Sequence, residues 1–515
     1  MLAHSILLGQ LPSGHVDTPG GPRAQPGYLT RGVVTVGDSH IRHGSFRRTL
    51  MGTLAVLGLA AFAGGCVDED TVYNDRPFSD DPPASAGGFL GYVQGQAGEP
   101  TCAQCHATPS ASWTTTAHAG AWSTLQESGG AQAFCEACHA VSQLGNAATD
   151  DVGWTSTADP RYQDVQCESC HGAGETHVAD PQANQPIPSL AVGTDLTNGC
   201  GECHNGAHHP FVEQWELSKH SEVVGFAAAR AECAGCHRGQ GTLLAWGVRS
   251  QYLERDSEEP LPVVCGVCHD PHETTFEGQL RFPVATADVT LHLCARCHNR
   301  RSNPDPNSSH GLEPHSPETE LLVGEAGWIP PGADLDFGAI VASHGTENNE
   351  KLCATCHVVM YEIEDEATGS FVFNSVGHTF QAIACVDDAG IPTGETDCPV
   401  DTTSRSFAGC VDSGCHSSEG GASAILNVRA DFNADLSATL LALLIQVDPN
   451  LDEPGGEIDA SNSTFTVAEG SFFNYNLANH GGDIYASTTH NPPWIRSLLV
   501  ASIDAVEDEY GVSLP

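Results

Sequence analysis

Two apolar segments near the C-terminus stand out in the hydropathy pattern of the chain. LSATLLALLIQV, residues 436–447, is continuously apolar, and its twelve residues suit a buried helix. PPWIRSLLVASIDAVEDEYG begins with proline at a helix entry, and we expect this second helix to run to Gly511. Between the two, STFTVAEGSFFNYNL alternates weakly between apolar and polar residues, which predicts a short hairpin or a loop.

The middle of the chain offers much less periodicity. Residues 98–320 show no sustained helical or strand pattern, and 55 glycines and 31 prolines in the whole chain predict many turns. We therefore expect a mainly α fold with much irregular coil, in which short helices and loops lead to a helical C-terminal part.

The N-terminal region carries an export signal, but it comes late. Arg47 and Arg48 precede an apolar run from Leu50 to Ala63, which is too short to span a membrane. The sequence AGGC at 63–66 resembles a lipoprotein cleavage box, with Cys66 as the lipidated residue. The usual leucine three positions before the cysteine is missing, so plain cleavage is the alternative.

These features divide the N-terminal region into three predicted parts. Residues 1–45 precede the signal and are expected to be an untranslated or dispensable extension. Residues 46–65 form the predicted lipoprotein signal peptide. Residues 66–97 are acidic and rich in Pro, Ser and Gly, which predicts a flexible tether.

The chain is strongly acidic, with a formal net charge of −45 and lysine only at positions 219 and 351. Such a chain is not expected to bind nucleic acid or an anionic membrane surface electrostatically. The charge favours either solubility alone or the attraction of cations and basic partner surfaces.

The cysteines change this picture, because sixteen of the 21 form eight Cys-x-x-Cys pairs that are each followed directly by histidine. The pairs are Cys102/Cys105, Cys135/Cys138, Cys167/Cys170, Cys200/Cys203, Cys233/Cys236, Cys265/Cys268, Cys294/Cys297 and Cys353/Cys356. The histidines are His106, His139, His171, His204, His237, His269, His298 and His357. Because this histidine recurs at the same position in all eight pairs, we infer that it acts together with the two cysteines in one site.

Cys-x-x-Cys-His is the attachment signature of c-type haem. Two thiols add to the two vinyl groups of one haem, and the next residue then lies beneath the ring, where its imidazole reaches the iron. Zinc ribbons need two cysteine pairs for each metal and have no use for the following histidine. A thioredoxin-like dithiol would occur once. The repeated motif therefore predicts covalently bound haem c.

CVDSGCH, residues 410–416, is a widened version of the same motif. Four residues separate Cys410 from Cys415, and His416 again follows directly. We interpret it as a ninth haem site; the alternative is a disulfide that involves one of its cysteines. Cys385 and Cys398 then remain as a pair and are expected to form a disulfide in an oxidising compartment.

The spacing of the motifs predicts three further regions. The first seven motifs recur every 29 to 33 residues, which is typical of a repeat array. We assign residues 98–320 to a seven-haem repeat region and 321–425 to two further haem motifs with an insertion loop. Residues 426–515 form a C-terminal helical segment that supplies a distal ligand.

Each haem iron takes a second axial ligand, and the chain has more spare histidines than nine haems need. His177 follows His171 after a Gly-Ala-Gly bend and is expected to serve as a distal ligand, not necessarily for the same haem. His118 and His220 share the context Trp-x4-His. The ten predicted distal ligands are His118, His177, His208, His209, His220, His272, His315, His344, His378 and His490. Weaker candidates are His292, His310 and His480.

With two imidazoles on each iron, the haems would be six-coordinate and low-spin, with no open position for a substrate. Haem potentials depend on the axial ligands, burial and nearby charge. Two imidazoles and an acidic surface both favour the ferric form, so we expect low potentials.

The motifs CESCHGAGETH, CGVCHDPHE, LCARCHN, CATCHVVM with GHTF, GCVDSGCH and HNPPWIRSLL resemble those of bacterial multihaem c-type cytochromes over residues 98–510. The resemblance implies a chain wrapped around a stack of haems. It extends distantly to octahaem reductases and ammonia-forming nitrite reductases, which keep one haem open, often with lysine in place of the motif histidine. No Cys-x-x-Cys-Lys is present in this chain.

The leading hypothesis is electron transfer by an exported outer-membrane lipoprotein, on its periplasmic or cell-surface side. About nine bis-histidine haems would relay electrons to other redox proteins or to extracellular metal acceptors. The alternative is a multihaem oxidoreductase that acts on a nitrogen or sulfur oxyanion, such as nitrite, hydroxylamine or tetrathionate. A subunit of a cytochrome filament is a third hypothesis, which a lipid anchor fits poorly.

Overall fold

The computed structural model describes residues 87–514, apart from 94–95, 97, 147–152, 194–196, 207–208, 309, 336–342, 346–348, 365–367, 369–370, 376, 413, 452, 462 and 483. The predicted extension, signal peptide, Cys66 and most of the tether lie outside these residues, and so does His208.

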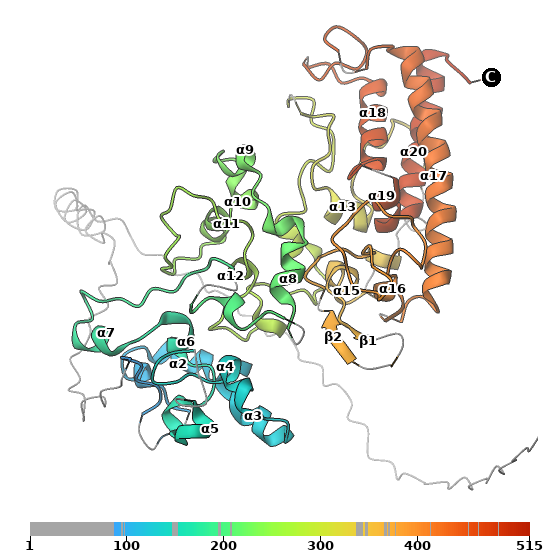
Figure 1. The fold of residues 1–515 in the computed structure, drawn as a ribbon. Coiled ribbons are helices and arrows are strands. Elements are labelled where there is room, and N and C mark those ends of the chain that lie inside the picture. Colours follow the sequence, from blue (N-terminus) through green and yellow to red (C-terminus); the bar gives the residue numbers. More distant parts are fainter. Residues whose placement is uncertain are drawn as a thin grey trace, which may run out of the picture. The chain divides into compact units, whose positions relative to one another are not determined.

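Short helices and coil make up the motif region (Figure 1). The helices before residue 420 are α2 (Ala107–Trp113), α3 (Ala121–Ser128), α4 (Glu136–His139), α5 (Trp154–Thr157), α6 (Cys167–His171), α7 (Glu175–Ala179), α8 (Phe211–Glu216), α9 (Gly225–Ala228), α10 (Ala234–His237), α11 (Gly239–Ala245), α12 (Cys265–Cys268), α13 (Glu318–Val323), α15 (Cys353–His357) and α16 (Ala408–Asp412). Helices follow some motifs, as α2 and α11 do; elsewhere the motif is itself the helical turn.

Single 3₁₀ turns and two strands complete this region. The turns are η1 (Thr101–Gln104), η2 (Ala117–Gly120), η3 (Ala133–Cys135), η4 (Pro160–Tyr162), η5 (Cys200–Glu202), η6 (Lys219–Ser221), η7 (Glu277–Gln279), η8 (Val289–Leu291), η9 (Cys294–Arg296) and η10 (Ser343–Gly345). Strands β1 (Tyr361–Glu364) and β2 (Phe371–Ser375) pair antiparallel. The expected mainly α fold with much coil is confirmed.

The C-terminal part is a helical bundle of α17 (Glu419–Val447), α18 (Val467–Ala478), α19 (Ile484–His490) and α20 (Pro492–Tyr510) (Figure 1). Its core contains Leu440, Leu443, Phe473, Leu477 and Trp494, which are almost fully buried. Burial of such side chains contributes roughly 1.5–3 kcal/mol each, so this bundle needs no haem to form a core.

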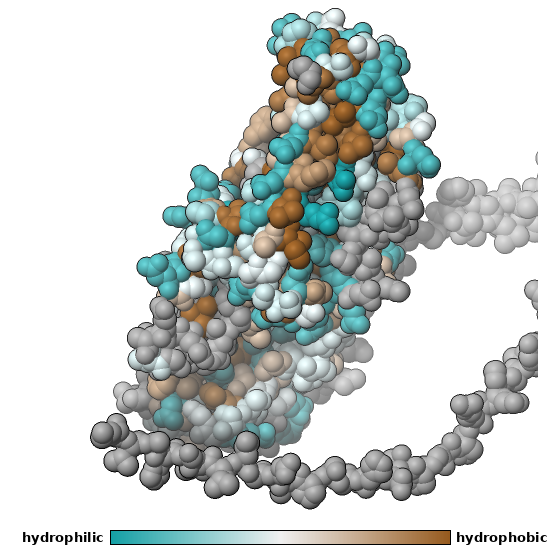
Figure 2. All heavy atoms as spheres, turned by 90° about the vertical axis from the view of Figure 1, so that its right-hand side faces the viewer, coloured by the Kyte–Doolittle hydropathy of each residue, from teal (hydrophilic) through white to brown (hydrophobic). Residues whose placement is uncertain are grey.

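The helix predicted at 436–447 is confirmed as the second half of α17. The first half carries small residues on its buried face, such as Ala422 and Ala430, and these weaken the hydropathy signal. By length and composition α17 could cross a membrane, but it packs with α18, α19 and α20 around one core. Apolar side chains also reach the surface in the view of Figure 2. On α17, Val428 and Phe432 are exposed.

The second predicted helix is also confirmed, since α20 begins at Pro492 and Gly511 follows it with a φ of 64°. The hairpin or loop predicted at 463–477 is wrong, because α18 covers most of it. A capping box joins Thr466 and Glu469 at its start. Phe473 and Leu477, one turn apart, are buried on one face. The capping signal and this helical spacing outweigh the weak alternation.

Candidate haem-binding sites

A helical turn presents both cysteines of a motif on one side. In α6, α12 and α15 the first motif cysteine begins the helix, and residues three apart on a helix share a face. The amide N–H of the motif histidine donates to the carbonyl of the first cysteine, with distances of 2.8 Å at His106 and 2.9 Å at His269. This bond places the imidazole directly beyond the two thiols.

The widened motif closes with the same hydrogen bond. The N–H of His416 donates to the carbonyl of Cys410 over 3.0 Å, although two more residues lie between them than in the other motifs. The added residues therefore lengthen the loop without changing how it begins and ends. This geometry favours haem attachment at Cys410 and Cys415.

Motif histidines face other histidines at one recurring distance. A metal–imidazole nitrogen bond is about 2 Å long and the ring centre lies about 1 Å further, so two imidazoles that share one metal have centres about 6 Å apart. The pairs, with the motif histidine first, are His106 and His177 (6.0 Å), His171 and His272 (6.1 Å), His204 and His118 (6.0 Å), His237 and His315 (5.8 Å), His269 and His378 (6.3 Å), His298 and His220 (6.3 Å), His357 and His490 (6.2 Å), and His416 and His344 (6.3 Å).

These pairs join motifs that are distant in the sequence. His177 follows His171 by six residues but faces His106, while His171 faces His272. Burial lowers the pKa of His204 and His220 to about 4. Both imidazoles are therefore neutral at pH 7 and keep a lone pair for a metal.

The Trp-x4-His segments position two of these histidines in the same way. The indole N–H of Trp113 donates to the carbonyl of Val165 over 3.2 Å, and Val165 N–H donates to the carbonyl of His118 over 3.1 Å. Trp215 and His220 make the matching bonds to Val263, at 2.9 and 3.0 Å. Val165 and Val263 each lie two residues before a motif cysteine, so these bonds fix a histidine against a neighbouring motif.

His139 differs from the other motif histidines. Among the described residues no imidazole faces it at this distance, and its Nδ1 is buried without a hydrogen-bond partner. Of the two remaining predicted ligands, His209 lies 6.1 Å from His204, which already faces His118. The other, His208, lies outside the described residues.

The weaker candidates have other surroundings. His292 is fully buried; its Nδ1 accepts from Cys294 N–H over 3.2 Å, and its Nε2 lies 3.1 Å from the Lys351 carbonyl. His310 is exposed, 3.6 Å from Glu313. His480 lies 3.4 Å from Glu318. None of the three faces a motif histidine in the described part of the chain.

The cysteine geometry argues against zinc ribbons. In the described residues, the one group of at least three metal-donor side chains whose ligand atoms lie within 4.8 Å is His292, Cys294 and Cys353. A zinc ribbon would bring two whole Cys-x-x-Cys pairs together. The cysteines of the eight regular motifs are not disulfide-bonded, whereas Cys385 and Cys398 form the predicted disulfide.

Thiols of different motifs nevertheless meet in pairs. The thiols interact electrostatically in the pairs Cys102 and Cys167, Cys138 and Cys203, Cys200 and Cys265, Cys236 and Cys297, and Cys294 and Cys353, and the Sγ atoms of the last pair lie within 4.8 Å of each other. Through-space electrostatic interactions also link Cys170 to Cys200, Cys268 to Cys297, and Cys356 to both Cys410 and Cys415. Because each thiol would attach to one side of a haem, haems attached at these motifs would lie near one another.

Cys105 is exposed, as are Cys170 and Cys415, whereas its motif partner Cys102 is only partly accessible. The N–H of Cys105 donates to the carbonyl of Cys102 over 3.1 Å, and the second cysteine makes the same bond at Cys203 and Cys297. Haem attachment at Cys105 rests on the motif, as it does at the other motif cysteines.

Glutamates inside the motifs hold the surrounding loops. Both carboxylate oxygens of Glu168, in the motif 167–171, accept from the buried N–H of Leu90, at 3.0 and 2.8 Å. Glu168 also accepts from the N–H groups of Gly91 and Gly174, each over 2.7 Å. Burial raises the pKa of Glu168, and these three N–H groups oppose the rise. Sequence reasoning missed this residue, and its place between two motif cysteines was the available signal.

The Nδ1 atoms of several ligand candidates bond to fixed acceptors. His171, His269 and His357 lie 2.8, 2.7 and 2.6 Å from the carbonyls of Pro186, Gly278 and Phe380. Such a bond fixes the ring and leaves Nε2 for the metal. At His298 the acceptor is a carboxylate instead, with Glu318 Oε2 at 3.3 Å, and this hydrogen bond raises the pKa of His298.

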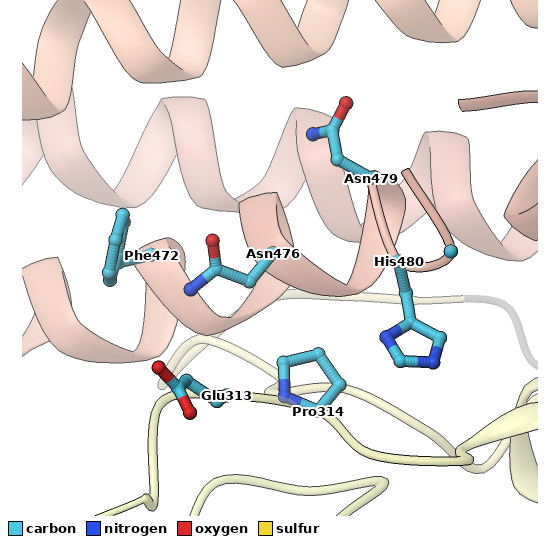
Figure 3. A pocket seen from close by; sticks show the side chains of 7 residues that line it. Glu313, Pro314, Phe472, Asn476, Asn479 and His480 are labelled. Atoms are coloured by element: carbon cyan, nitrogen blue, oxygen red, sulfur yellow. The ribbon is translucent and has the colours of Figure 1, made fainter. Parts of the chain in front are cut away.

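A separate hollow of about 330 Å³ lies between α18 and the loop that carries Glu313 and Pro314 (Figure 3). The wall opposite this loop is formed by Phe472 and Asn476 of α18 and by His480, which follows that helix. No cysteine or motif histidine lines this hollow, so it is not a haem site.

Two family models match parts of the chain. Residues 101–172 match the model described as cytochrome c554 and c-prime, and residues 259–303 match the doubled CXXCH motif. Both matched segments contain the cysteine motifs and paired histidines described above. The chain is a multihaem c-type cytochrome. It binds haem c through its CXXCH motifs, and its helix-and-coil fold accords with this assignment.

No curated protein matches this cytochrome. Among solved structures, it is similar to the outer cell wall cytochrome OcwA, with 15% identity, a TM-score of 0.49, and coverage of 81% of this chain and 99% of that one. It is also similar to an undecahaem cytochrome from the S-layer of Carboxydothermus ferrireducens, with 17% identity, a TM-score of 0.38, and coverage of 67% and 50%. Both scores are below 0.5, so the assignment rests on the motifs and the family models.

Proposed function

We propose that this cytochrome transfers electrons through nine haems c, numbered 1 to 9 in the order of their motifs. The observation that carries the proposal is the set of eight imidazole pairs with ring centres 5.8 to 6.3 Å apart. An iron between two imidazoles has both axial positions filled. It can change its oxidation state but has no position for a substrate, which suits electron transfer.

The thiol contacts support a route along the haems. Contacts between Cys102 and Cys167 and between Cys170 and Cys200 join haem 1 to haem 3 and haem 3 to haem 4. The remaining contacts continue the series through haems 6, 7, 8 and 9. Haem 2 branches from haem 4, and haem 5 branches from haem 7. Electrons would thus pass along a connected series with two side branches.

Haem 2 needs its second ligand from elsewhere in the chain. The thiol of its Cys138 interacts with that of Cys203, so a haem attached at Cys138 would lie near the motif that ends at His204. His208 follows that motif by four residues, and we assign it to haem 2 on this ground. His209 then serves as the alternative ligand.

The location and partners are proposed from the sequence alone. Covalent haem attachment takes place outside the cytoplasm in bacteria, and a lipid on Cys66 would hold the cytochrome at the outer membrane. The net charge of −45 would concentrate cations near exposed haem edges. Extracellular metal ions and basic faces of other redox proteins are therefore the proposed acceptors. The mature protein should begin at a lipidated Cys66; a mature N-terminus near Met1 contradicts this location.

A second candidate function depends on His139. If haem 2 keeps an open position, it could bind a nitrogen or sulfur oxyanion, and the cytochrome would be an oxidoreductase. The observation that favours this alternative is that no described imidazole faces His139 at the recurring distance. The acidic surface, which repels anions, argues against it.

Electron paramagnetic resonance of the oxidised protein separates the two functions. Electron transfer predicts low-spin ferric signals that account for every haem and do not change with nitrite, hydroxylamine or tetrathionate. It also predicts that the reduced protein is reoxidised fully by a ferric chelate. A high-spin signal from about one haem in nine, shifted by one of these anions, would favour the oxidoreductase.

A further inference from the structure

Resting on the proposed ligation of haem 7 by His298, we propose that the carboxylate of Glu318 lowers the reduction potential of this haem below that of its neighbours. Glu318 acts through His298 and is a positioning residue that tunes the iron without touching it. Its role follows from one hydrogen bond, from the fixed position of the carboxylate and from the place of haem 7 in the series.

The hydrogen bond joins Nδ1 of His298 to Oε2 of Glu318 over 3.3 Å. Glu318 begins α13, and the next amide, Thr319 N–H, donates to the carbonyl of His298 over 3.0 Å. The other carboxylate oxygen lies 3.4 Å from Nε2 of His480. Backbone and side-chain contacts thus hold Glu318 against the axial ligand.

Other ligand candidates have neutral acceptors at Nδ1. The carbonyls of Pro186, Gly278 and Phe380 take this place at the motif histidines of haems 3, 6 and 8. Distal candidates also meet carbonyls, as His344 does at Thr489 over 2.9 Å. A full negative charge at Glu318 therefore distinguishes His298 from these ligands.

Among the described residues, one other carboxylate lies within 4 Å of a motif histidine or of one of the ten predicted distal ligands, and it is already paired with a cation. Asp270 Oδ1 is 3.6 Å from Nδ1 of His272, beyond ordinary hydrogen-bond length. Asp270 also forms an ion pair with Arg281 over 2.7 Å, which offsets its charge. Glu318 contacts two histidines and, among the described residues, forms no ion pair with lysine or arginine.

A carboxylate at Nδ1 makes the imidazole a stronger electron donor to the metal. Stronger donation stabilises the ferric form, so the potential falls. Arg296 and Arg300 lie in and beside the same motif and oppose this effect through space. Both arginines stay in place when Glu318 alone is changed, so a Glu318 variant isolates the contribution of the carboxylate.

A difference in reduction potential has most effect at haem 7, because three neighbouring haems connect to it in the proposed series. Its cysteines Cys294 and Cys297 interact electrostatically with cysteines of haems 5, 6 and 8, and the Sγ atoms of Cys294 and Cys353 lie within 4.8 Å of each other. An electron that moves between haem 6 and haem 8 along the proposed series passes haem 7. A low potential there makes this step uphill and divides the series into two groups of haems.

The test compares Glu318→Gln with Glu313→Gln, because Glu313 is an exposed carboxylate near the same segment. Glutamine keeps the acceptor and removes the charge. In Glu318→Gln we expect nine haems, all low-spin. The reduction potential of one haem should rise by about 59 mV, which corresponds to a tenfold change in its ratio of reduced to oxidised iron at a fixed applied potential. The low-spin signal of the same haem should shift, while Glu313→Gln should match the parent.

Unchanged potentials and spectra in Glu318→Gln, with all nine haems present, would overturn the proposal, as would an equal shift in Glu313→Gln. Loss of haem 7 would show a structural role instead and overturn it as well. The proposal further predicts that Glu318→Asp, which keeps the charge, retains the haem and the low potential. A high-spin haem 7 in the parent protein would instead contradict the ligation itself, so the two failures are distinguishable.

Discussion

The imidazole of His272 lies 6.1 Å from that of His171, while His269, three residues before His272, faces His378. One short segment thus offers ligands to two haems. Each iron would then join two distant parts of the chain, which would help to hold a region of short helices and coil in a defined structure.

Replacement of His272 by alanine should open one haem only. Haem 3 would lose its distal imidazole and become high-spin, while haem 6, held by His269 and His378, should stay low-spin. Electron paramagnetic resonance should show high-spin iron equal to one haem, and free imidazole should restore the low-spin signal. His310→Ala, at an exposed histidine, serves as the control. A fully low-spin His272→Ala protein would refute this ligand assignment.

His490 and His480 provide a matched pair in the C-terminal bundle. His490 faces His357 at 6.2 Å, whereas His480 faces Glu318. His490→Ala should therefore convert haem 8 to the high-spin form, and His480→Ala should leave every haem low-spin. If His480→Ala also produced high-spin iron, the pairing would have to be revised.

The widened motif should carry a haem. In the double variant Cys410→Ser and Cys415→Ser, the intact mass of the holoprotein should be lower by the mass of one haem. Ser at both Cys385 and Cys398 removes the disulfide instead and should leave the haem content unchanged. An unchanged haem content in the Cys410/Cys415 variant would show that no haem is attached here and would favour the alternative, a disulfide that involves one of these cysteines.

Glu168→Ala should destabilise the N-terminal haem region by about 2 kcal/mol or more, because three buried N–H groups lose their acceptor. Urea unfolding followed by far-ultraviolet circular dichroism measures this change. Glu127→Ala, at an exposed position of α3, should have little effect. Equal stability of the two variants would show that the bonds to Glu168 contribute little.

Glu168 should also give the stability a pH dependence. Burial raises the pKa of Glu168, so above the unfolded pKa of about 4.3 the folded chain still holds a proton that the unfolded chain has released. The free energy of unfolding should therefore fall as the pH rises through the folded pKa. In Glu168→Gln the free energy of unfolding should fall less over the same pH range. If its pH dependence is the same as in the parent protein, other groups cause the fall.

Much of the candidate chemistry could be predicted because c-type haem attachment has a local signature. The cysteines and histidine of one motif are adjacent in sequence, so each site could be located without the fold. Distal ligands carry no such signature: His272 and His480 look alike as isolated histidines, and packing decides which of them faces a motif histidine. The predicted set already contained the eight distal histidines that the structure places opposite motif histidines. Which histidine faces which required the structure.

The fold was predictable where apolar residues alone form a core, as in α20. It was not predictable at α18, where a capping box and two buried residues outweigh a strand-like alternation. Glu168 and Glu318 were missed for a similar reason: a glutamate is common on any acidic chain, and its partners become visible only in three dimensions.

Intact mass spectrometry of the purified, denatured holoprotein tests the central claim most directly, because thioether-linked haem survives unfolding. The account predicts the mass of the processed polypeptide plus nine haems. The mass of bare polypeptide would contradict the claim that these cysteine pairs carry haem, and a mass with fewer than nine haems would contradict the proposed series.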